Sequence, residues 1–285
     1  MGGAVSTDAF EQHRAHLHAV AYRMLGSVGD ADDAVQDAWL RLRRTDVSDV
    51  RNLRGWLTTV VARICLDMLR ARSTRAEDPF GDGADIPAEA TDPEQEALLA
   101  DSIGVALLVI LQTLSPAERL AFVLQDMFEL PYADIGPIVG RSENAAAQLA
   151  ARARRRVRGR TPQTTDLARQ RQLVDAFLAA ARNGDFEALL RVLNDDVVLR
   201  VDAAAAGRAL TISGAEAVAT NAHRFSANAR FAEPALVDGL PGVVVAPGGR
   251  LTMVLRFTVS GDAITEITID ADPKRLHRFE LAVLN

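Results

Sequence analysis

The chain has 285 residues, 48% of them hydrophobic, which suits two or three globular domains. A net charge of -6 argues against a protein that coats nucleic acid indiscriminately. No stretch approaches about twenty uninterrupted apolar residues, and the first residues lack a signal-peptide pattern, so we expect a cytoplasmic protein without a membrane span. The single cysteine, Cys65, and five scattered histidines predict no disulfide, no metal site and no cofactor.

Charge is segregated along the chain. Residues 51–75 hold six arginines against one acid, Asp67, and residues 77–101 hold nine acids and no base. Residues 141–160 are basic again, with seven arginines against one acid, Glu143. A basic block of that density is costly to hold together without a polyanion nearby.

The first block, from Asp8 to about Arg75, shows apolar side chains at helical spacing throughout. Three stripes predict three helices, and their apolar residues are Leu17, Val20, Ala21, Met24 and Leu25; Ala34, Val35, Ala38, Trp39 and Leu42; and Leu57, Val60, Val61, Ile64 and Met68. Residues 76–93 are rich in Asp, Glu, Gly, Pro and Ala without periodicity, which is typical of a mobile linker.

Residues 130–160 predict a helix-turn-helix that runs into an arginine cluster. Gly140 can take the left-handed conformation that ends a helix, and Ser142 can cap the next one. On the second helix the outward face carries Asn144, Gln148, Arg152 and Arg155, which can reach base edges and phosphates. A solvated helix in an all-helical bundle is the less favoured alternative.

Residues 166–285 differ in character. Two helical patterns, joined by an Asn-Gly-Asp turn at 183–185, precede strand-like runs at 197–201, 243–246, 251–259 and 263–269. This order predicts an α+β domain with helices packed on a curved sheet.

Two helices of the first block carry unusual charge. Asp33 and Asp37 form a like-charge i, i+4 pair, a cost that a basic partner would reverse. The third helix exposes Arg63, Asp67 and Arg70 opposite its apolar stripe, and Arg54 lies too early in it to serve the helix dipole. A plain solvated face explains the acidic charges equally well.

Three ordered motifs resemble those of alternative sigma factors of the extracytoplasmic-function (ECF) class: DADDAVQDAWLRL (30–42), LRGWLTTVVARICLDMLRAR (53–72) and residues 114–157. The tail resembles the SnoaL-like (NTF2-like) domain of one subset of that class. The resemblance implies a multidomain protein, with two all-α sigma domains followed by an α+β cone-shaped domain. The implied divisions are a region 2 domain at 8–75, an acidic linker at 76–101, a region 4 helix-turn-helix domain at 102–160, a linker at 161–168 and the SnoaL-like domain at 169–285.

The resemblance also implies partners. Asp33, Gln36 and Asp37 would bind the clamp helices of the largest subunit of core RNA polymerase. The minus-ten promoter element would be held by Arg54, Arg63, Asp67 and Arg70, with a flipped base in the loop 44–52. The minus-thirty-five element would be read by Arg141, Asn144, Gln148, Arg152 and Arg155. The acidic linker would either run through the polymerase cleft or act as an inert spacer, and the tail would adjust activity, with a small molecule as a possible ligand.

The chain departs from the family pattern at three places. Ala147 stands where a basic residue is usual, a glycine-rich segment of the tail is replaced by residues 202–208, and Asp272-Pro273-Lys274 only echoes a second tail motif.

Two other function classes are open. One is a one-component helix-turn-helix regulator with a ligand-binding tail, which would not need the acidic helix. The other is catalysis in the tail by Asp202, His223, Asp238 or Asp270, which a pocket without a buried carboxylate would exclude. We favour a non-enzyme.

Overall fold

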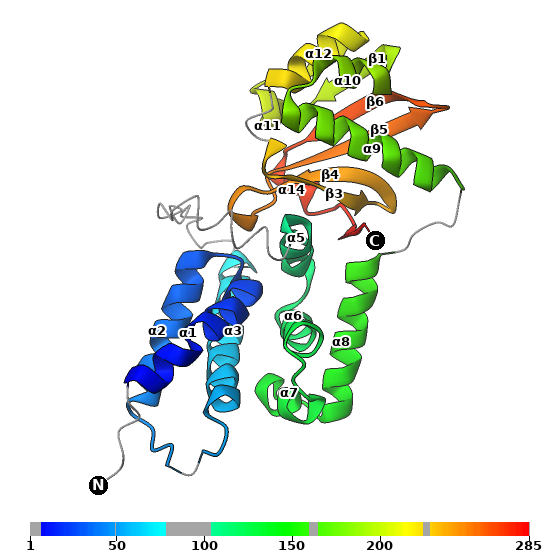
Figure 1. Ribbon diagram of the computed structural model, residues 1–285. Helices are drawn as coiled ribbons and strands as arrows, with labels where there is room; N and C mark the ends of the chain where they lie inside the picture. Colours follow the sequence, from blue (N-terminus) through cyan, green and yellow to red (C-terminus); the bar gives the residue numbers. More distant parts are fainter. Residues whose placement is uncertain (1–6, 49, 78–103, 160–164, 225–228, 285) are drawn as a thin grey trace. The chain divides into compact units, whose positions relative to one another are not determined.

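The computed structural model describes residues 7–48, 50–77, 104–159, 165–224 and 229–284 (Figure 1). Their contacts divide the chain into two compact units. Unit 1 holds the N-terminal helices and most of the helix-turn-helix. Unit 2 holds the tail, together with the start of helix α5 and the last residues of helix α8. No helix of the described ranges is long and apolar enough to cross a membrane.

Unit 1 begins with three helices that lie side by side, α1 (Thr7–Leu25), α2 (Val28–Leu42) and α3 (Leu53–Glu77) (Figure 1). The three predicted stripes form their shared core, with Leu17, Val35 and Leu57 fully buried. Helix α3 continues two residues into the segment predicted as a linker, and the remainder of that acidic linker lies outside the described residues.

The helix-turn-helix prediction is confirmed. Helix α7 (Tyr132–Val139) ends at Gly140, whose φ of 70° is left-handed, and helix α8 (Glu143–Arg158) follows. The Ser142 hydroxyl accepts a 3.3 Å hydrogen bond from the Ala145 backbone N–H, as the sequence predicts. The apolar residues predicted for the two helices are buried, including Ile135, Ala146 and Ala150.

Helices α5 (Val105–Thr113) and α6 (Pro116–Phe122) precede the helix-turn-helix. Helix α6 starts with a capping box, in which the Ser115 hydroxyl and the Glu118 carboxylate satisfy each other's backbone N–H groups. Helix α6 then widens into a π-helix (Val123–Met127), a turn that the hydrophobic periodicity does not predict.

Within unit 1, α6 and the π-helix pack against the first three helices. Arg119 is only 5% exposed, and its Nη1 donates a 2.8 Å hydrogen bond to the Met24 carbonyl oxygen. Burial, with a smaller contribution from the charge of Arg72, lowers the pKa of the Arg119 guanidinium to about 10. Phe128 lies under the Arg23 guanidinium, 5.2 Å from ring centre to cation.

Unit 2 is an α+β domain, as predicted. Helices α9 (Thr165–Asn183) and α10 (Phe186–Val192) are joined through Gly184, with a φ of 65°, and Asp185, which caps α10. The strands are β1 (Leu193–Val201), β2 (Leu210–Ser213), β3 (Ala232–Val237), β4 (Leu240–Val245), β5 (Met253–Ser260), β6 (Ala263–Asp270) and β7 (Leu281–Val283). The four predicted strands correspond to β1, β4, β5 and β6. Strands β2, β3 and β7 were not predicted.

The sheet order is β2-β1-β6-β5-β4-β3-β7, and only the β1–β6 pair is parallel. Helices α9, α10 and α12 (Ala215–Arg224) lie against one face of this sheet (Figure 1). Phe177 of α9 meets Phe257 of β5 edge to face at 5.3 Å, which joins the helical layer to the sheet. Two further short helices, α11 (Ala203–Ala206) and α14 (Pro273–Leu276), follow β1 and β6.

Candidate nucleic-acid and protein interfaces

Helix α2 presents an acidic surface, made of Asp33, Gln36 and Asp37. All three side chains are exposed, and Leu40 beside them is 39% exposed, unusual for a leucine. Within the described residues neither Asp33 nor Asp37 forms an ion pair. The three predicted polymerase-binding residues therefore share one exposed face that is open to a basic partner.

The other acids of α2 are already paired. Asp30 forms an ion pair with Arg72 of α3, and the Asp32 carboxylate lies 3.3 Å from His18 Nε2. These contacts hold α2 against α3 and α1, so Asp30 and Asp32 have a structural explanation that Asp33 and Asp37 lack.

The four residues predicted to bind the minus-ten element do not form one surface. Arg63, Asp67 and Arg70 are exposed on α3 at spacings of four and three, which puts them on one side, here named the α3 surface. Arg54 is exposed too. It precedes Arg63 by nine residues, which is about two and a half helical turns, so it lies on the opposite side of α3 from Arg63.

Arg54 instead belongs to a small network with α1. Its Nη2 lies 3.0 Å from His16 Nδ1, and His16 Nε2 lies 3.0 Å from the Thr58 hydroxyl, which donates to the Arg54 carbonyl oxygen. Because a guanidinium only donates, Nδ1 must accept and the imidazole is neutral. Burial, and next the charge of Arg54, lower the pKa of His16.

The outward face of α8, here named the α8 surface, carries the predicted duplex-reading side chains. Arg141, Asn144, Gln148 and Arg155 are exposed. Arg152 is also exposed, but its Nε lies 3.2 Å from a carboxylate oxygen of Glu118 in α6.

Two neighbouring positions modify the α8 surface. Ala147 lies half-buried one residue before Gln148, so the position where a basic residue is usual offers only a methyl group. Arg154 is turned inward to Asp126 and Tyr132, with an Asp126 ion pair at 2.8 Å. The arginine cluster is therefore partly structural.

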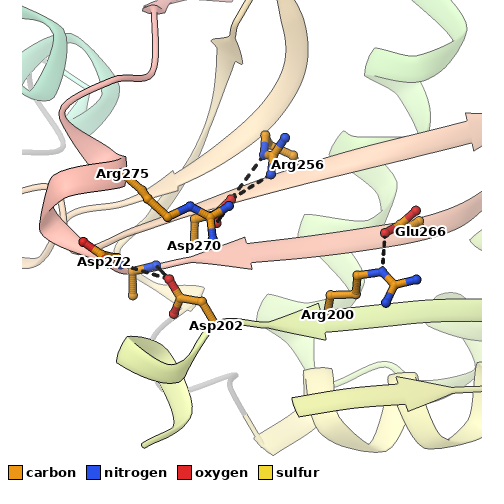
Figure 2. Close-up of polar contacts among 8 residues, drawn as sticks. Arg200, Asp202, Arg256, Glu266, Asp270, Asp272 and Arg275 are labelled. Carbon is orange, nitrogen blue, oxygen red and sulfur yellow. Dashed lines mark hydrogen bonds and ion pairs between the residues drawn. The ribbon is translucent and has the colours of Figure 1, made fainter. Parts of the chain in front are cut away.

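The two unusual tail segments meet in unit 2. The Asp202 carboxylate accepts hydrogen bonds from the backbone N–H groups of Ala271, Asp272 and Ala205, at 2.8, 3.0 and 2.9 Å. Figure 2 shows Asp202 beside Asp272. Burial raises the pKa of Asp202, but the three N–H donors outweigh it and lower the pKa overall. Segments 202–208 and 272–274, which depart from the family pattern, are thus one structural junction.

Asp270, at the end of β6, is fully buried and lies between two arginines (Figure 2). Arg256 Nη2 is 3.0 Å from one carboxylate oxygen and Arg275 Nη2 is 2.5 Å from the other. Such a pairing is what permits a carboxylate in a protein interior.

A cavity of about 70 Å³ lies in unit 2, between the helices and the sheet. Its described wall is apolar, with Phe177 from α9, Val218 from α12 and Val243 from β4, apart from the amide of Asn221. None of the four candidate general acids or bases lines it. His223 and Asp238 are exposed, and Asp202 and Asp270 are held by the contacts above. A catalytic site built on these residues is not supported.

One contact of unit 2 has no signal in the sequence. The Glu233 carboxylate of β3 accepts a 2.9 Å hydrogen bond from the backbone N–H of Ala106, in the first turn of α5. The two residues are 127 positions apart, so no local pattern indicates the pair.

Cys65 is buried, and burial raises the pKa of its thiol to about 12, which confirms the predicted core role. Across the described ranges no group of three or more His, Cys, Asp or Glu side chains is placed to hold a metal ion.

Comparison with known proteins identifies two conserved domain types. Residues 9–75 match the sigma-70 region 2 family and residues 104–157 match the sigma-70 region 4 family. The chain is 36% identical over 277 residues to "Probable ECF RNA polymerase sigma factor SigI" of Mycobacterium tuberculosis, covering 94% of this chain and 93% of that protein. It is 40% identical over 200 residues to "ECF RNA polymerase sigma factor SigJ" of the same species, covering 68% and 64%.

A crystal structure of M. tuberculosis SigJ aligns over 95% of this chain and 98% of its own, with 30% identity and a TM-score of 0.46. The tail is an α+β domain with a seven-stranded sheet, as the sequence predicts for its fold class. Identity above 30% across nearly the whole of both chains establishes the relationship with SigI. The chain belongs to the ECF family of RNA polymerase sigma factors.

Proposed function

We propose that this chain binds core RNA polymerase and directs it to a specific set of promoters. The observation that carries the proposal is the acidic surface of α2, which has no ion pair among the described residues and lies within a region 2 domain that precedes a region 4 helix-turn-helix. A one-component regulator would need only the helix-turn-helix to bind DNA. That alternative assigns no partner to the acidic surface or to the α3 surface.

Each surface takes a distinct partner in this proposal. The acidic surface docks on the basic clamp helices of the largest polymerase subunit. The α3 surface follows the melted minus-ten strand, where arginines neutralise phosphates, and the loop 44–52 receives a flipped base. The α8 surface reads the minus-thirty-five duplex, with Asn144 and Gln148 suited to adenine. Acting on core polymerase, the chain works in the cytoplasm.

The tail adjusts this activity. Glu233 caps the first turn of α5, and α5 opens the segment that matches region 4, so this hydrogen bond joins the tail to the start of that segment. The cavity in the same tail offers a place for a small-molecule ligand.

The test is transcription by purified core polymerase and the full chain on a library of genomic fragments, with the 5′ ends of the transcripts sequenced. The expected result is a set of start sites that share two upstream elements and that are absent with core polymerase alone. The Asp33→Arg/Asp37→Arg variant serves as the control that removes polymerase docking. A transcript set identical to that of core polymerase alone would overturn the proposal.

A further inference from the structure

The cavity of unit 2 lies between a helical layer and the sheet, and it is partly open. Helices α9 and α12 supply one wall, and strands β1, β3, β4, β5 and β6 supply the other. Most of its side chains, such as Phe177, Val218 and Ile267, also belong to the hydrophobic core of this unit. The cavity is therefore a gap within a packed core, and its shape is fixed by the fold.

Asn221 is the polar exception in this wall. It lies on α12, half-buried, and its amide makes no hydrogen bond within the described residues. The amide of a half-buried asparagine keeps part of its contact with water, so it is available to a second hydrogen-bonding group. An amide left open at an apolar cavity can both donate to and accept from a bound molecule.

The wall also determines which molecules are excluded. A charged group would lose its hydration, and the described lining holds no charged side chain to compensate for that loss. An apolar cavity of about 150 Å³ takes up benzene, and the cavity here has about half that volume. The space therefore fits a short alkyl chain better than a six-membered ring.

We propose that this cavity binds a short aliphatic chain that ends in an uncharged polar group, such as a hydroxyl or a carbonyl, paired with the amide of Asn221. The binding itself needs only the cavity. Its regulatory meaning rests on the proposed function.

The cavity is connected to the helix that opens the region 4 match. Ala232 of β3 lines the cavity, and the next residue, Glu233, accepts the hydrogen bond from Ala106 at the start of α5. Ala232 and Glu233 are joined by a peptide bond, so a ligand that shifts the backbone at Ala232 also shifts Glu233. Because successive side chains of a strand point to opposite faces, Ala232 can face the cavity while Glu233 faces α5. Ala232 pairs with Val245 of β4, which also lines the cavity. A ligand in the cavity would therefore contact both strands of the β3–β4 hairpin.

The binding test uses 1-butanol and, as its charged counterpart, butanoate, added to the full chain labelled with ¹⁵N. We expect the side-chain amide signals of Asn221 to shift saturably with 1-butanol and not with butanoate. Asn221→Leu should weaken 1-butanol binding about five- to tenfold, measured on the backbone signals of α12, because one hydrogen bond is lost.

Two matched variants localise the site. Ala222→Leu adds a side chain into the cavity and should abolish the saturable shift, whereas Ala217→Leu makes the same change on the exposed face of α12 and should preserve it. Equal responses to butanol and butanoate, or saturable binding that survives in Ala222→Leu, would overturn the assignment.

The connection to α5 has its own readout. The backbone signal of Ala106 should move with the same concentration dependence as that of Asn221, and in Glu233→Ala only the Asn221 signal should still move. An Ala106 signal that ignores 1-butanol in the unmodified chain would refute the connection. Transcripts without any butanol shift would overturn the cavity assignment alone, whereas a butanol shift without promoter-specific transcripts would overturn the proposed function alone.

Discussion

Arg152 Nε lies 3.2 Å from a carboxylate oxygen of Glu118, whose side chain is 8% exposed. The same carboxylate accepts hydrogen bonds from the Ser115 backbone N–H and hydroxyl, at 3.3 and 2.8 Å. Arg152 therefore joins the recognition helix α8 to the start of α6. A contact between Arg152 and DNA therefore either shares the guanidinium with Glu118 or breaks this ion pair.

This pairing predicts different outcomes for two arginines of the α8 surface. Arg155→Ala should weaken binding to a minus-thirty-five duplex about tenfold and lower the slope of log K against log salt by about one, because one phosphate contact is lost. Its thermal unfolding should match that of the unmodified chain, since Arg155 is exposed.

Arg152→Ala should in addition destabilise unit 1 by about 0.5–1 kcal/mol, because its ion pair with the largely buried Glu118 carboxylate is lost. Both tryptophans, Trp39 and Trp56, lie in unit 1, so intrinsic fluorescence reports its unfolding. Equal unfolding midpoints for Arg152→Ala and Arg155→Ala would contradict a structural role for the Glu118 pair.

The acidic surface of α2 gives a second prediction. Asp33→Arg/Asp37→Arg should reduce co-purification with core polymerase at least about a hundredfold, since like charges then face each other across the interface. The fold should persist, because both side chains are exposed and unpaired among the described residues.

The matched control for this surface is Asp195→Arg/Asp196→Arg, which makes the same charge change at exposed positions of the tail. It should leave co-purification unchanged. An equal loss in both double variants would mean that net charge, and not the α2 surface, controls polymerase binding.

Much of the fold follows from sequence because its signals are local. Helical spacing located α1, α2 and α3, and Gly140 with Ser142 located the turn of the helix-turn-helix. The strands that were missed are the short β2, the edge strand β7, and β3, which contains Pro234. Each depends on its neighbours in the sheet more than on its own periodicity.

The site was less predictable because it depends on long-range pairs. The resemblance assigned Arg54 to the minus-ten element together with Arg63, but its guanidinium lies against His16, 38 positions earlier. Asp270 was considered as a general acid, although Arg256 and Arg275 hold it in an ion cluster. Exposure and charge can be read from spacing, whereas the partner of a charged side chain is decided by tertiary packing.

His16 predicts a pH dependence for unit 1. Its pKa is lowered in the folded state, so below its ordinary value of 6.5 the unfolded chain binds the proton first. The stability that the neutral imidazole contributes is thus fully present above about pH 6.5 and is lost as the pH falls toward the lower folded-state pKa. Protonation would also place an N–H on Nδ1 against the Arg54 donor.

The measurement is the urea midpoint of unit 1, followed by tryptophan fluorescence between pH 5 and 8, for the unmodified chain and for His16→Gln. The unmodified chain should lose stability on acidification through this range more steeply than the variant, which has no titratable group at this position. Parallel pH profiles for the two proteins would show that His16 is not the titrating group.

The ion cluster around Asp270 predicts a large stability difference between two similar substitutions. Asp270→Asn removes a fully buried charge from between Arg256 and Arg275 and should destabilise unit 2 by about 2–3 kcal/mol, because both guanidinium groups lose their counter-charge and one of them then faces an amide NH2. Glu266 lies on the same strand as Asp270, and at the surface it pairs with Arg200 of β1 (Figure 2). Glu266→Gln removes this pair and should cost no more than about 0.5 kcal/mol.

Both variants are compared by hydrogen exchange of the β5 and β6 amides, since the tyrosines and tryptophans of this chain all lie in unit 1 and do not report on the tail. Faster exchange in Asp270→Asn than in Glu266→Gln is expected throughout these paired strands. Similar exchange in the two variants would mean that the buried cluster contributes no more than a surface ion pair, and that the junction at residues 270–275 is held by the Asp202 hydrogen bonds instead.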